Sequence, residues 1–392
     1  MKICIVGPSK RFFSGITNQT VFLANALSKR NEVSVILLRN LLPRFLFPGR
    51  EHIDKDQYVV DFSSEVKVYD GMDYNSPLSW IGAYKFLKKH KPDVMVVLWW
   101  TSSVAHMQII LRIMNRWSIK AKNVLEMHEV VDPLEESIIP LRIYSRLTGC
   151  RLVKGADICT VKSEFNKTQI SKIYGISEDK IFVIPHGLYE NYKQISDKNQ
   201  AKRELGIQEE FVILYFGLIR HYKGVPDLIK AFARIPIDVA RHSRLLIVGE
   251  VWEENDMLRQ MIDSSPYKDQ ITLEAKYIAD SLIPKYFSSS DVVVLPYLRS
   301  AGSGVAHLAM TYGKPIIVSD VPALRESLGD YPGSIFVEPG NPDTIRDNIE
   351  AIYQAVVSGK DLHYNSTHAT WDDIARQYET IIENLVSRRT VQ

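Results

Sequence analysis

The chain has 392 residues, more than one hydrophobic core usually serves, so its length predicts two domains of ordinary size. Hydrophobic residues make up 45% of the chain and charged residues 24%, and 48 Lys and Arg nearly balance 46 Asp and Glu. The composition is typical of a globular protein, and the balanced charge excludes a globally basic protein that binds nucleic acid.

Cysteine usage and hydropathy bear on the location of the protein. Cys4, Cys150 and Cys159 lie far apart without metal-ligand spacing, and their odd number favours reduced thiols in the cytoplasm. The apolar run in residues 1–7 is too short for a signal peptide, and no later segment approaches the about eighteen apolar residues of a membrane span. We therefore expect a cytoplasmic protein that at most attaches to the inner face of the membrane.

Short segments rich in Val and Ile alternate with helical patterns along the whole chain, as in parallel sheets with crossover helices. In the first half the pattern predicts a helix at 16–30 and strands at 2–6, 33–38, 94–98, 123–127, 158–161 and 181–184. In the second half it predicts a helix at 225–233 and strands at 211–216, 245–248, 271–273, 292–295 and 316–318. The predicted fold class is α/β, with two Rossmann-like, doubly wound sheets.

A boundary between the two halves is expected near residue 190. Pro185-His186-Gly187 is followed by the polar stretch 195–200, in which few apolar contacts can form, so a linker is predicted there. The predicted domains are residues 1–190 and 191–370. The final segment, 371–392, has apolar residues at helical spacing. This helix can dock on either domain and is expected to complete the first.

The segment FGLIRHYKG, residues 216–224, directly follows the first strand of the second half and begins a helix. A loop there lies at the carboxyl ends of the strands, where open α/β sheets bind ligands. Gly217 allows close approach of the backbone to a ligand, and Arg220 and Lys223 supply two positive charges that can neutralise a diphosphate leaving group. The alternative is a solvated basic loop with a helix-starting glycine.

A second glycine-containing segment, residues 296–305, connects the strand at 292–295 to a helix that ends near 313–315. Small residues at 301–304 expose backbone amides at the amino terminus of that helix, where the helix dipole favours an anion. The alternative is a tight turn that needs glycine for its backbone angles. Two such segments on one rim of a sheet favour phosphate binding.

As an ordered set, these segments resemble the donor domain of the family 4 retaining glycosyltransferases. The resemblance is carried by residues 216–224, 248–250, 291–297, 302–305 and 313–315, and by 163–164 and 183–187 at the end of the first domain. It covers nearly the whole chain. It implies the GT-B fold, in which two Rossmann-like domains face each other across a cleft.

The resemblance also implies an activity. A hexose would pass from a UDP- or GDP-linked sugar, bound by the second domain, to a glycan or lipid-linked acceptor bound by the first. The product would belong to polysaccharide or glycolipid biosynthesis, and no metal or other cofactor is expected.

The family pattern implies which residues contact the donor. Arg220 and Lys223 would bind the diphosphate and act in catalysis, residues 302–305 would meet the distal phosphate and the sugar, and Gly15 would belong to the glycine loop after the first strand. The complete implied donor-binding set is Gly15, Gly217, Arg220, Lys223, Gly249, Glu250, Tyr277, Gly302, Ser303, Gly304 and Val305.

One departure from the family concerns two glutamates that many members carry eight positions apart. Aligning on residues 309–313 places Ser300 and Leu308 at these positions. A subset of the family has a Ser-Gly-Val turn, as at 303–305, so we interpret the departure as subfamily membership. The alternative is a non-catalytic sugar- or nucleotide-binding protein of the same fold.

In the first half, Glu126-Met127-His128-Glu129 ends a predicted strand, which places polar side chains at the interdomain cleft. His128 resembles the histidine that lines the family's sugar site and is assigned a catalytic role, because imidazole can donate or accept near neutral pH. A histidine that caps a strand end is the alternative. Glu129 is a candidate for acceptor binding or a plain surface carboxylate. Trp99 and Trp100 can stack on an acceptor sugar or pack in the core.

Two further segments carry weaker signals. Asp54-Lys55-Asp56 has the spacing of a metal-binding carboxylate pair, but no strand follows, and we interpret it as a solvated charge run. Residues 41–50, LLPRFLFPGR, interleave Leu, Phe and Arg with Pro and Gly that disfavour a regular helix. They can contact an anionic membrane, helped by Arg39, Arg44 and Arg50, or fold over their own domain.

Overall fold

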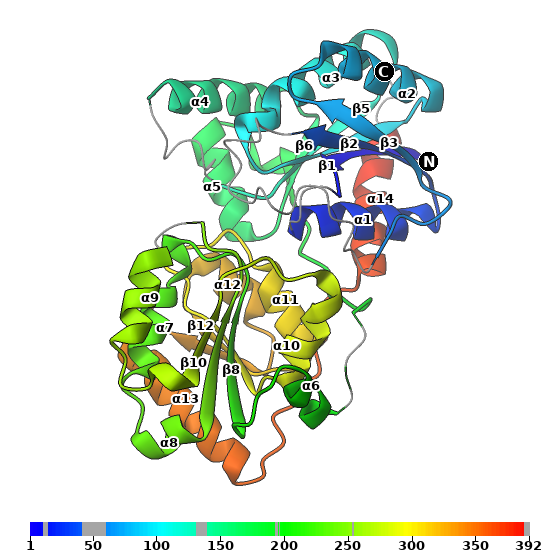
Figure 1. The fold of residues 1–392 in the computed structure, drawn as a ribbon. Coiled ribbons are helices and arrows are strands. Elements are labelled where there is room, and N and C mark those ends of the chain that lie inside the picture. The colour runs from blue at the N-terminus through cyan, green and yellow to red at the C-terminus, as the bar shows by residue number, and fades with distance from the viewer. Residues whose placement is uncertain are drawn as a thin grey trace. The chain divides into compact units, whose positions relative to one another are not determined.

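The computed structural model describes residues 1–10, 15–40, 60–130, 139–192, 195, 197–252 and 255–387 (Figure 1). These residues divide into two compact units. The first comprises the described residues of Met1–Asp56, Val60–Gly187 and Ala369–Gln392, and the second those of Leu188–His368. Each unit is built on its own parallel β-sheet.

The sheet of the first unit has seven strands in the order β3-β2-β1-β4-β5-β6-β7, and every described pair is parallel. The strands are β1 (Lys2–Pro8), β2 (Glu32–Asn40), β3 (Lys67–Asp73), β4 (Val94–Trp99), β5 (Lys122–Met127), β6 (Ile158–Val161) and β7 (Ile181–Val183). The central strand β4 is buried along its whole length because helices cover both faces of the sheet. The strand order reverses between β1 and β4, which is where doubly wound sheets bind ligands.

Helices connect these strands and cover the sheet. They are α1 (Gly15–Ser28), α2 (Pro77–His90), η3 (Ser102–Val104), α3 (Ala105–Ser118), α4 (Ile139–Lys154), α5 (Glu164–Tyr174), η5 (Glu178–Lys180) and α14 (Trp371–Ser387). Local sequence fixes their ends, as α5 illustrates. The Ser163 side chain accepts a hydrogen bond from the Asn166 backbone N–H, and Gly175 ends the helix in a left-handed conformation.

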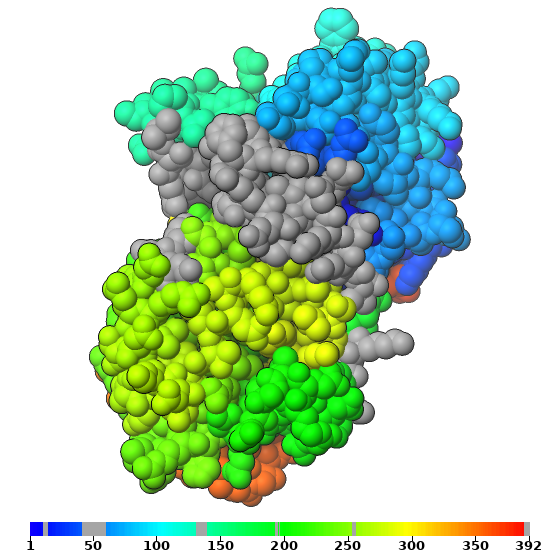
Figure 2. Space-filling view, in the orientation of Figure 1, coloured from blue at the N-terminus to red at the C-terminus, as the bar shows by residue number. Residues whose placement is uncertain are grey.

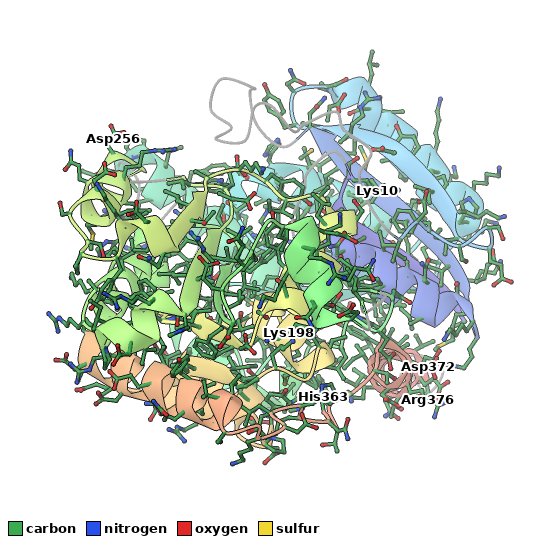
Figure 3. All side chains as sticks on the ribbon, turned by 60° about the horizontal axis from the view of Figure 1, so that its bottom comes forward. Lys10, Lys198, Asp256, His363, Asp372 and Arg376 are labelled. Carbon is green, nitrogen blue, oxygen red and sulfur yellow. The ribbon has the colours of Figure 1, made fainter. Side chains whose placement is uncertain are left out.

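The C-terminal helix α14 belongs to the first unit, and in Figure 1 it lies beside α1. The rings of Phe22 and Trp371 are 5.6 Å apart between centroids. Arg30 on the α1 side forms ion pairs of 2.8 Å with Asp372 and 2.9 Å with Glu379. Asp372 also pairs with Arg376 one turn further along α14, at 3.1 Å (Figure 3). Aromatic packing and charge pairing together hold this helix against the N-terminal part of the chain.

The sheet of the second unit has six strands in the order β10-β9-β8-β11-β12-β13, again all parallel. The strands are β8 (Phe211–Phe216), β9 (Ser243–Val248), β10 (Ile271–Glu274), β11 (Val292–Leu295), β12 (Ile316–Ser319) and β13 (Ser334–Val337). Its helices are α6 (Lys198–Glu204), η6 (His221–Lys223), α7 (Val225–Phe232), α8 (Ile237–Arg241), α9 (Asn255–Asp263), η7 (Lys268–Gln270), η8 (Asp280–Leu282), α10 (Ile283–Ser289), α11 (Gly304–Thr311), α12 (Pro322–Leu328) and α13 (Pro342–Val357).

The predicted fold class, two doubly wound Rossmann-like sheets, is confirmed. The polar stretch 195–200 is not a plain linker, because α6 begins at Lys198 with Asp197 as its cap. Two edge strands were not predicted. In β3, a Gly and several polar residues break the alternation, and its pairing with β2 shifts register between Leu37 and Leu38.

Candidate functional site

The loop after β8 holds two cations among aromatic rings. Arg220 Cζ lies 5.6 Å from the centre of the Tyr222 ring and 5.5 Å from that of Trp252. Lys223 Nζ lies 5.2 Å from the centre of Tyr222 and 3.7 Å from that of Tyr297. Positive charge over an aromatic face is attracted by the ring quadrupole, so the rings help to hold both side chains at the carboxyl end of the sheet.

Glycines let three loops of the second unit touch through their backbones. Gly224 has a φ of 68° and Gly217 a φ of 113°, conformations that L side chains rarely adopt. A Cβ at Gly224 would lie 1.9 Å from the carbonyl oxygen of Pro296, and one at Gly249 would lie 1.8 Å from that of Gly217. The loops after β8, β9 and β11 therefore form one continuous platform that has no room for side chains at these points.

The amino terminus of α11 adjoins this platform. The Ser303 hydroxyl accepts a hydrogen bond of 3.2 Å from the Ala306 backbone N–H and so caps the helix. Gly304 and Val305 stand in the first turn, whose N–H groups find no partners within a helix. A Cβ at Gly217 would lie 3.1 Å from Val305 Cγ2. The two segments predicted to bind phosphate thus lie next to each other.

Glu250 and Tyr277 of the implied donor set follow β9 and β10 in the second unit. Glu250 follows β9, and its carbonyl accepts a hydrogen bond of 2.9 Å from the Ile219 N–H. Tyr277 follows β10, and its hydroxyl donates to Asp280 at 3.3 Å. The buried Asp280 carboxylate also accepts a hydrogen bond of 3.0 Å from the Tyr192 hydroxyl. The Asp280 carboxylate therefore holds the Tyr277 side chain beyond the carboxyl end of β10.

The two positions that depart from the glutamate pattern have local structural roles. The Ser300 hydroxyl accepts from the Gly302 N–H at 3.1 Å and donates to the Gly302 carbonyl at 2.8 Å, which closes a turn. Leu308 is buried in α11. Neither position presents a carboxylate to a ligand at the carboxyl edge of the sheet.

Sequence reasoning missed Trp252 in this site. Trp252 is 36% exposed and follows the bridge between Ile219 and Val251, and its ring lies beside Arg220. The signal was weak because a single tryptophan after a short strand is compatible with core packing. Only the contact with Arg220, 32 positions earlier in the chain, identifies it as part of the loop platform.

In the first unit, His128 directly follows β5, and its backbone N–H donates to the Trp99 carbonyl at 3.0 Å. Its side chain is 10% exposed. Burial lowers the pKa of His128 to about 4, although the charge of Glu126 acts in the opposite direction. The imidazole is therefore neutral at neutral pH.

Glu126 is the centre of a buried polar cluster that sequence reasoning did not assign. Its side chain is fully buried at the end of β5, and Lys162 Nζ donates to Glu126 Oε1 at 2.5 Å. The side-chain amide of Gln19 donates to the same oxygen, and His128 Nε2 lies 3.6 Å from it. Burial alone raises the pKa of Glu126, but the charge of Lys162 and the side-chain hydrogen bonds lower it below its ordinary value. The carboxylate is therefore ionised at neutral pH.

The C-terminal helix reaches the same cluster. Thr160 on β6 is the register partner of Glu126, and its hydroxyl is 3.2 Å from the hydroxyl of Tyr378 on α14. Burial raises the pKa of Tyr378, and the adjacent Glu126 raises it further. A neutral phenol from the end of the chain thus closes the cluster on one side.

The remaining predicted residues of the first unit differ in exposure. Trp99 is 2% exposed, and its ring packs edge-on against Tyr174 with 6.1 Å between centroids, which supports the core-packing alternative. Trp100 is half-buried and Glu129 is exposed. Gly15 is exposed at the start of α1, with open space around its Cβ position.

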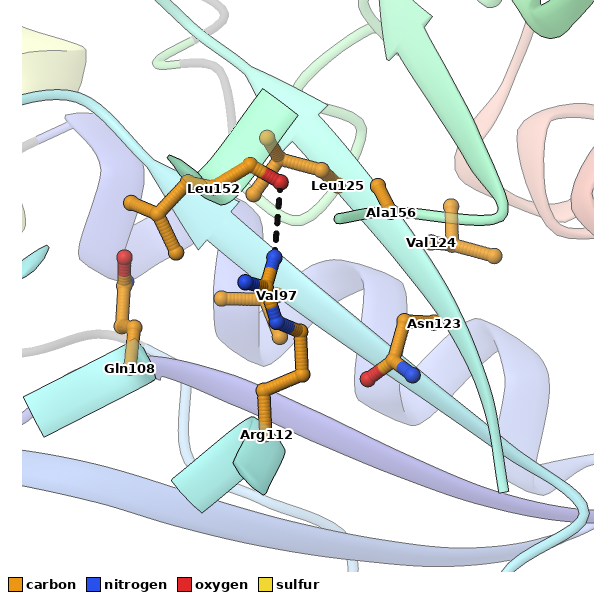
Figure 4. Close-up of a pocket in the computed structure, with 8 residues that line it drawn as sticks. All are labelled: Val97, Gln108, Arg112, Asn123, Val124, Leu125, Leu152 and Ala156. Atoms are coloured by element: carbon orange, nitrogen blue, oxygen red, sulfur yellow. Dashed lines mark hydrogen bonds between the residues drawn. The ribbon is translucent and has the colours of Figure 1, made fainter. Parts of the chain in front are cut away.

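The pocket in Figure 4 lies between the sheet of the first unit and helices α3 and α4. The Arg112 guanidinium donates to the Leu152 carbonyl at 2.9 Å, and Gln108 donates to the Leu98 carbonyl at 2.8 Å. The pocket has about 10 Å³ of free space, which is room for one water molecule. It is lined by Val97, Gln108, Arg112, Asn123, Val124, Leu125, Leu152 and Ala156.

Metal ligation and membrane spanning find no support in the described part of the chain. Among these residues, no group of three or more His, Cys, Asp or Glu side chains is placed to hold a metal ion. None of the described helices combines the length and apolar character needed to cross a bilayer. Asp54-Lys55-Asp56 and residues 41–50 lie outside the described residues.

Solved structures share this architecture over the full chain. A sucrose-phosphate synthase from Thermosynechococcus elongatus superposes with a TM-score of 0.73 at 15% identity, covering 99% of both chains. The Anabaena protein HepE, solved with UDP and glucose, superposes with a TM-score of 0.68 at 17% identity, covering 100% of both chains. The fold is that of the GT-B class of glycosyltransferases.

Family models match both halves of the chain. A model described as "Glycosyltransferase Family 4" matches residues 13–190, and one described as "Glycosyl transferases group 1" matches residues 197–367. The chain therefore belongs to the family 4 glycosyltransferases.

Curated relatives match the chain in part. An uncharacterized glycosyltransferase of Methanocaldococcus jannaschii is 27% identical over 54% of this chain and 56% of its own length. A D-inositol 3-phosphate glycosyltransferase of Paenarthrobacter aurescens is 26% identical over 56% of this chain and 54% of its own. The chain thus spans about half the length of these two relatives. A capsular polysaccharide biosynthesis glycosyltransferase of Staphylococcus aureus, CapM, is 24% identical over 62% of this chain and 71% of its own length.

Proposed function

We propose that the protein transfers a hexose from a nucleoside-diphosphate sugar to a glycan or lipid-linked acceptor, with retention of configuration. The carrying observation is the placement of Arg220 and Lys223 at the carboxyl end of the second sheet, beside the amino terminus of α11. Two cations and a helix amino terminus together favour an anion with more than one negative charge. A diphosphate has this charge, and in the proposal residues 191–370 form the donor domain.

In the proposed reaction, the bond between the anomeric carbon and the diphosphate oxygen breaks. Arg220, Lys223 and the amides at the start of α11 stabilise the negative charge that develops on the diphosphate. The acceptor hydroxyl attacks the anomeric carbon from the face that the diphosphate leaves, and its proton passes to a diphosphate oxygen. We assign no protein nucleophile and no general base.

The first domain, residues 1–190, would bind the acceptor and contribute His128 to the sugar site. A neutral imidazole at the end of β5 can exchange a hydrogen bond with a sugar hydroxyl without adding charge. The exposed Glu129 and the half-buried Trp100 are the candidates for acceptor contact. Trp99 is not included, because its ring is buried.

The donor is proposed to be UDP- or GDP-linked, with no metal required. HepE, which shares the fold, was solved with UDP and glucose. Among the curated relatives is an O-antigen chain mannosyltransferase of Escherichia coli, 22% identical over 50% of this chain. These names support glucose and mannose as the first sugars to test, each offered as a UDP- or GDP-linked donor, and a polysaccharide or glycolipid as the product.

A thermal-shift screen of nucleotide sugars followed by turnover tests this proposal. A ligand present at about a hundred times its Kd adds about 2.7 kcal/mol to the stability of the folded protein, so the true donor should raise Tm. Proton NMR of the transferred sugar should then show the anomeric configuration of the donor. Binding without release of the nucleoside diphosphate, across a set of glycan and lipid acceptors, would instead support the non-catalytic alternative.

We also infer peripheral contact with an anionic membrane. The predicted contact segment 41–50 is outside the described residues, but helix α4, which lies on the surface of the first unit in Figure 2, carries side chains of suitable chemistry. Ile139, Ile143 and Leu147 recur at one-turn spacing and are 67%, 54% and 64% exposed. The helix contains three Arg and one Lys but no acidic residue. An exposed apolar row with basic neighbours is suited to the headgroup region.

Vesicle sedimentation tests the membrane contact. The protein should bind anionic vesicles and not neutral ones, and Ile143→Ser with Leu147→Ser should reduce binding. Ile237→Ser on α8 is the matched control, because Ile237 is 51% exposed in the second unit. Replacing Phe45 and Leu46 by Ser would test the 41–50 segment separately. Equal lack of binding to both kinds of vesicle would exclude the contact.

A further inference from the structure

Burying the Glu126 carboxylate costs solvation free energy, and the need to fill space in the core does not explain why a charged residue stands there. A carboxylate transferred from water to a buried position loses several kcal/mol of solvation unless charges and hydrogen bonds replace the lost water. Here Lys162 and Gln19 supply both, and they converge on one oxygen, Oε1. An apolar residue would fill this position at the end of a strand more simply. We therefore expect the negative charge of Glu126 to have a function.

The position of the fixed charge relative to His128 suggests that role. Glu126 Oε1 lies 3.6 Å from His128 Nε2, and Nε2 is a buried atom with no hydrogen bond to any described residue. At 3.6 Å the contact is longer than a hydrogen bond, so the carboxylate acts on the ring through its charge. Contacts of this kind often shorten when substrate binds.

The chemistry of the two groups determines where the imidazole proton resides. A neutral imidazole carries one N–H, on either Nδ1 or Nε2, and an ionised carboxylate can only accept a hydrogen bond. With the carboxylate facing Nε2, the proton is stabilised on Nε2 and Nδ1 keeps its lone pair. The other ring nitrogen is then an obligatory acceptor for a ligand hydroxyl.

The geometry points to Glu126 as a positioning residue that fixes His128 in its Nε2–H tautomer, so that Nδ1 accepts a hydrogen bond from a hydroxyl of the sugar substrate. This inference rests on the proposed function only for the identity of that hydroxyl. Lys162 and Gln19 hold the carboxylate in place, and Tyr378 brings the C-terminal helix into the same network. A carboxylate that orients a histidine without touching the ligand is a familiar arrangement around metal-bound histidines.

Nitrogen NMR of protein labelled with ¹⁵N at histidine reads the tautomer directly. The His128 signals are assigned by their disappearance in His128→Gln. The wild-type protein should show a protonated Nε2 and an unprotonated Nδ1 at pH 7. Glu126→Gln should shift the ring toward the other tautomer or a mixture, because a side-chain amide can donate as well as accept.

The single variant leaves Lys162 buried without its ion pair and can fail to fold. The double variant Glu126→Gln/Lys162→Met removes both charges at similar volume and serves in its place. Glu164→Gln is the matched control, since Glu164 is a 68% exposed carboxylate two positions after Lys162. We expect the control to leave the tautomer unchanged.

Kinetics supply a second readout. In the double variant, kcat should fall by roughly tenfold to a hundredfold while KM for the donor nucleotide sugar changes little, because the diphosphate contacts are untouched. A wild-type His128 protonated on Nδ1, or a tautomer that is the same in the wild type and the double variant, would overturn the inference. The expected tautomer in a protein that transfers no sugar would refute the proposed function and leave this inference standing.

Discussion

Acidification should destabilise the protein through His128, and the size of the effect follows from its burial. The pKa of His128 falls from 6.5 to about 4 in the folded chain, chiefly because burial disfavours the charged ring. In the unfolded chain the same ring binds a proton below about pH 6.5. The unfolded state therefore holds more protons than the folded state between these values, and stability falls as the pH drops through this window.

The magnitude is set by the depth of the pKa shift. Each pKa unit corresponds to about 1.4 kcal/mol, so a depressed histidine contributes about 3 kcal/mol at pH 7 that is lost by pH 4. About 2 kcal/mol of this should be lost between pH 6.5 and pH 5. Glu126, whose pKa is lowered, adds a second loss, but only below its unfolded value near 4.5. The interval from pH 7 to pH 5 therefore excludes Glu126, and a variant of His128 separates its effect from that of His90, whose pKa burial also lowers.

Urea unfolding followed by tryptophan fluorescence at several pH values between 7 and 5 measures this dependence. His128→Gln should make the pH dependence in this interval shallower by about 2 kcal/mol, because glutamine fills a similar space without titrating while His90 still titrates. His242→Gln is the control, since His242 is exposed in the second unit and should leave the slope unchanged. If the wild type and His128→Gln lost stability in parallel between pH 7 and pH 5, the buried neutral histidine would be the wrong description.

Three further predictions concern the proposed donor site. Arg220→Ala and Lys223→Ala should each lower turnover by about a hundredfold in a transfer assay, as expected for removing one charge-stabilising donor; near-normal rates in both would refute the diphosphate assignment. Gly224→Ala should destabilise the protein more than Gly206→Ala in urea unfolding. Both glycines have left-handed φ, but only at 224 would the new Cβ meet a carbonyl oxygen, at 1.9 Å. Excess EDTA should leave turnover unchanged, and restoration of a lost activity by magnesium or manganese would show that a metal is required.

The strands of both sheets could be predicted from sequence because parallel strands covered on both faces are continuous apolar runs. β4 and β11 illustrate this, since each is buried along its length. β3 and β13 were missed because edge strands bury less of their surface and tolerate polar residues. A helix start was predictable where a glycine marks it in the local sequence, as with Gly224 before α7.

In the candidate site, too, features that are local in the sequence could be predicted and contacts between distant residues could not. The loops at 216–224 and 296–305 could be located because their glycines and cations are close together in the sequence and follow clear strands. Trp252 could not be assigned, since its contact with Arg220 depends on the lateral order of β8 and β9. The sequence does not distinguish the two interpretations of Trp99, because whether a tryptophan at a strand end faces solvent or core depends on the helices that cover it.

The Glu126 cluster marks the limit of sequence reasoning here. Gln19, Glu126, Lys162 and Tyr378 come from α1, β5, the end of β6 and α14, so their convergence depends on the whole topology of the first unit. Yet the neighbouring sequence indicates that both charged residues are buried, because Glu126 lies within the largely apolar strand NVLEM and Lys162 directly follows the largely apolar strand ICTV. A charge next to or within a fully buried strand must find an opposite charge or lose its own. Consecutive strands in doubly wound sheets are usually neighbours, so an acid and a base at the ends of two such strands are expected to form an ion pair. Such a pair can be predicted from the sequence alone and tested by replacing both residues.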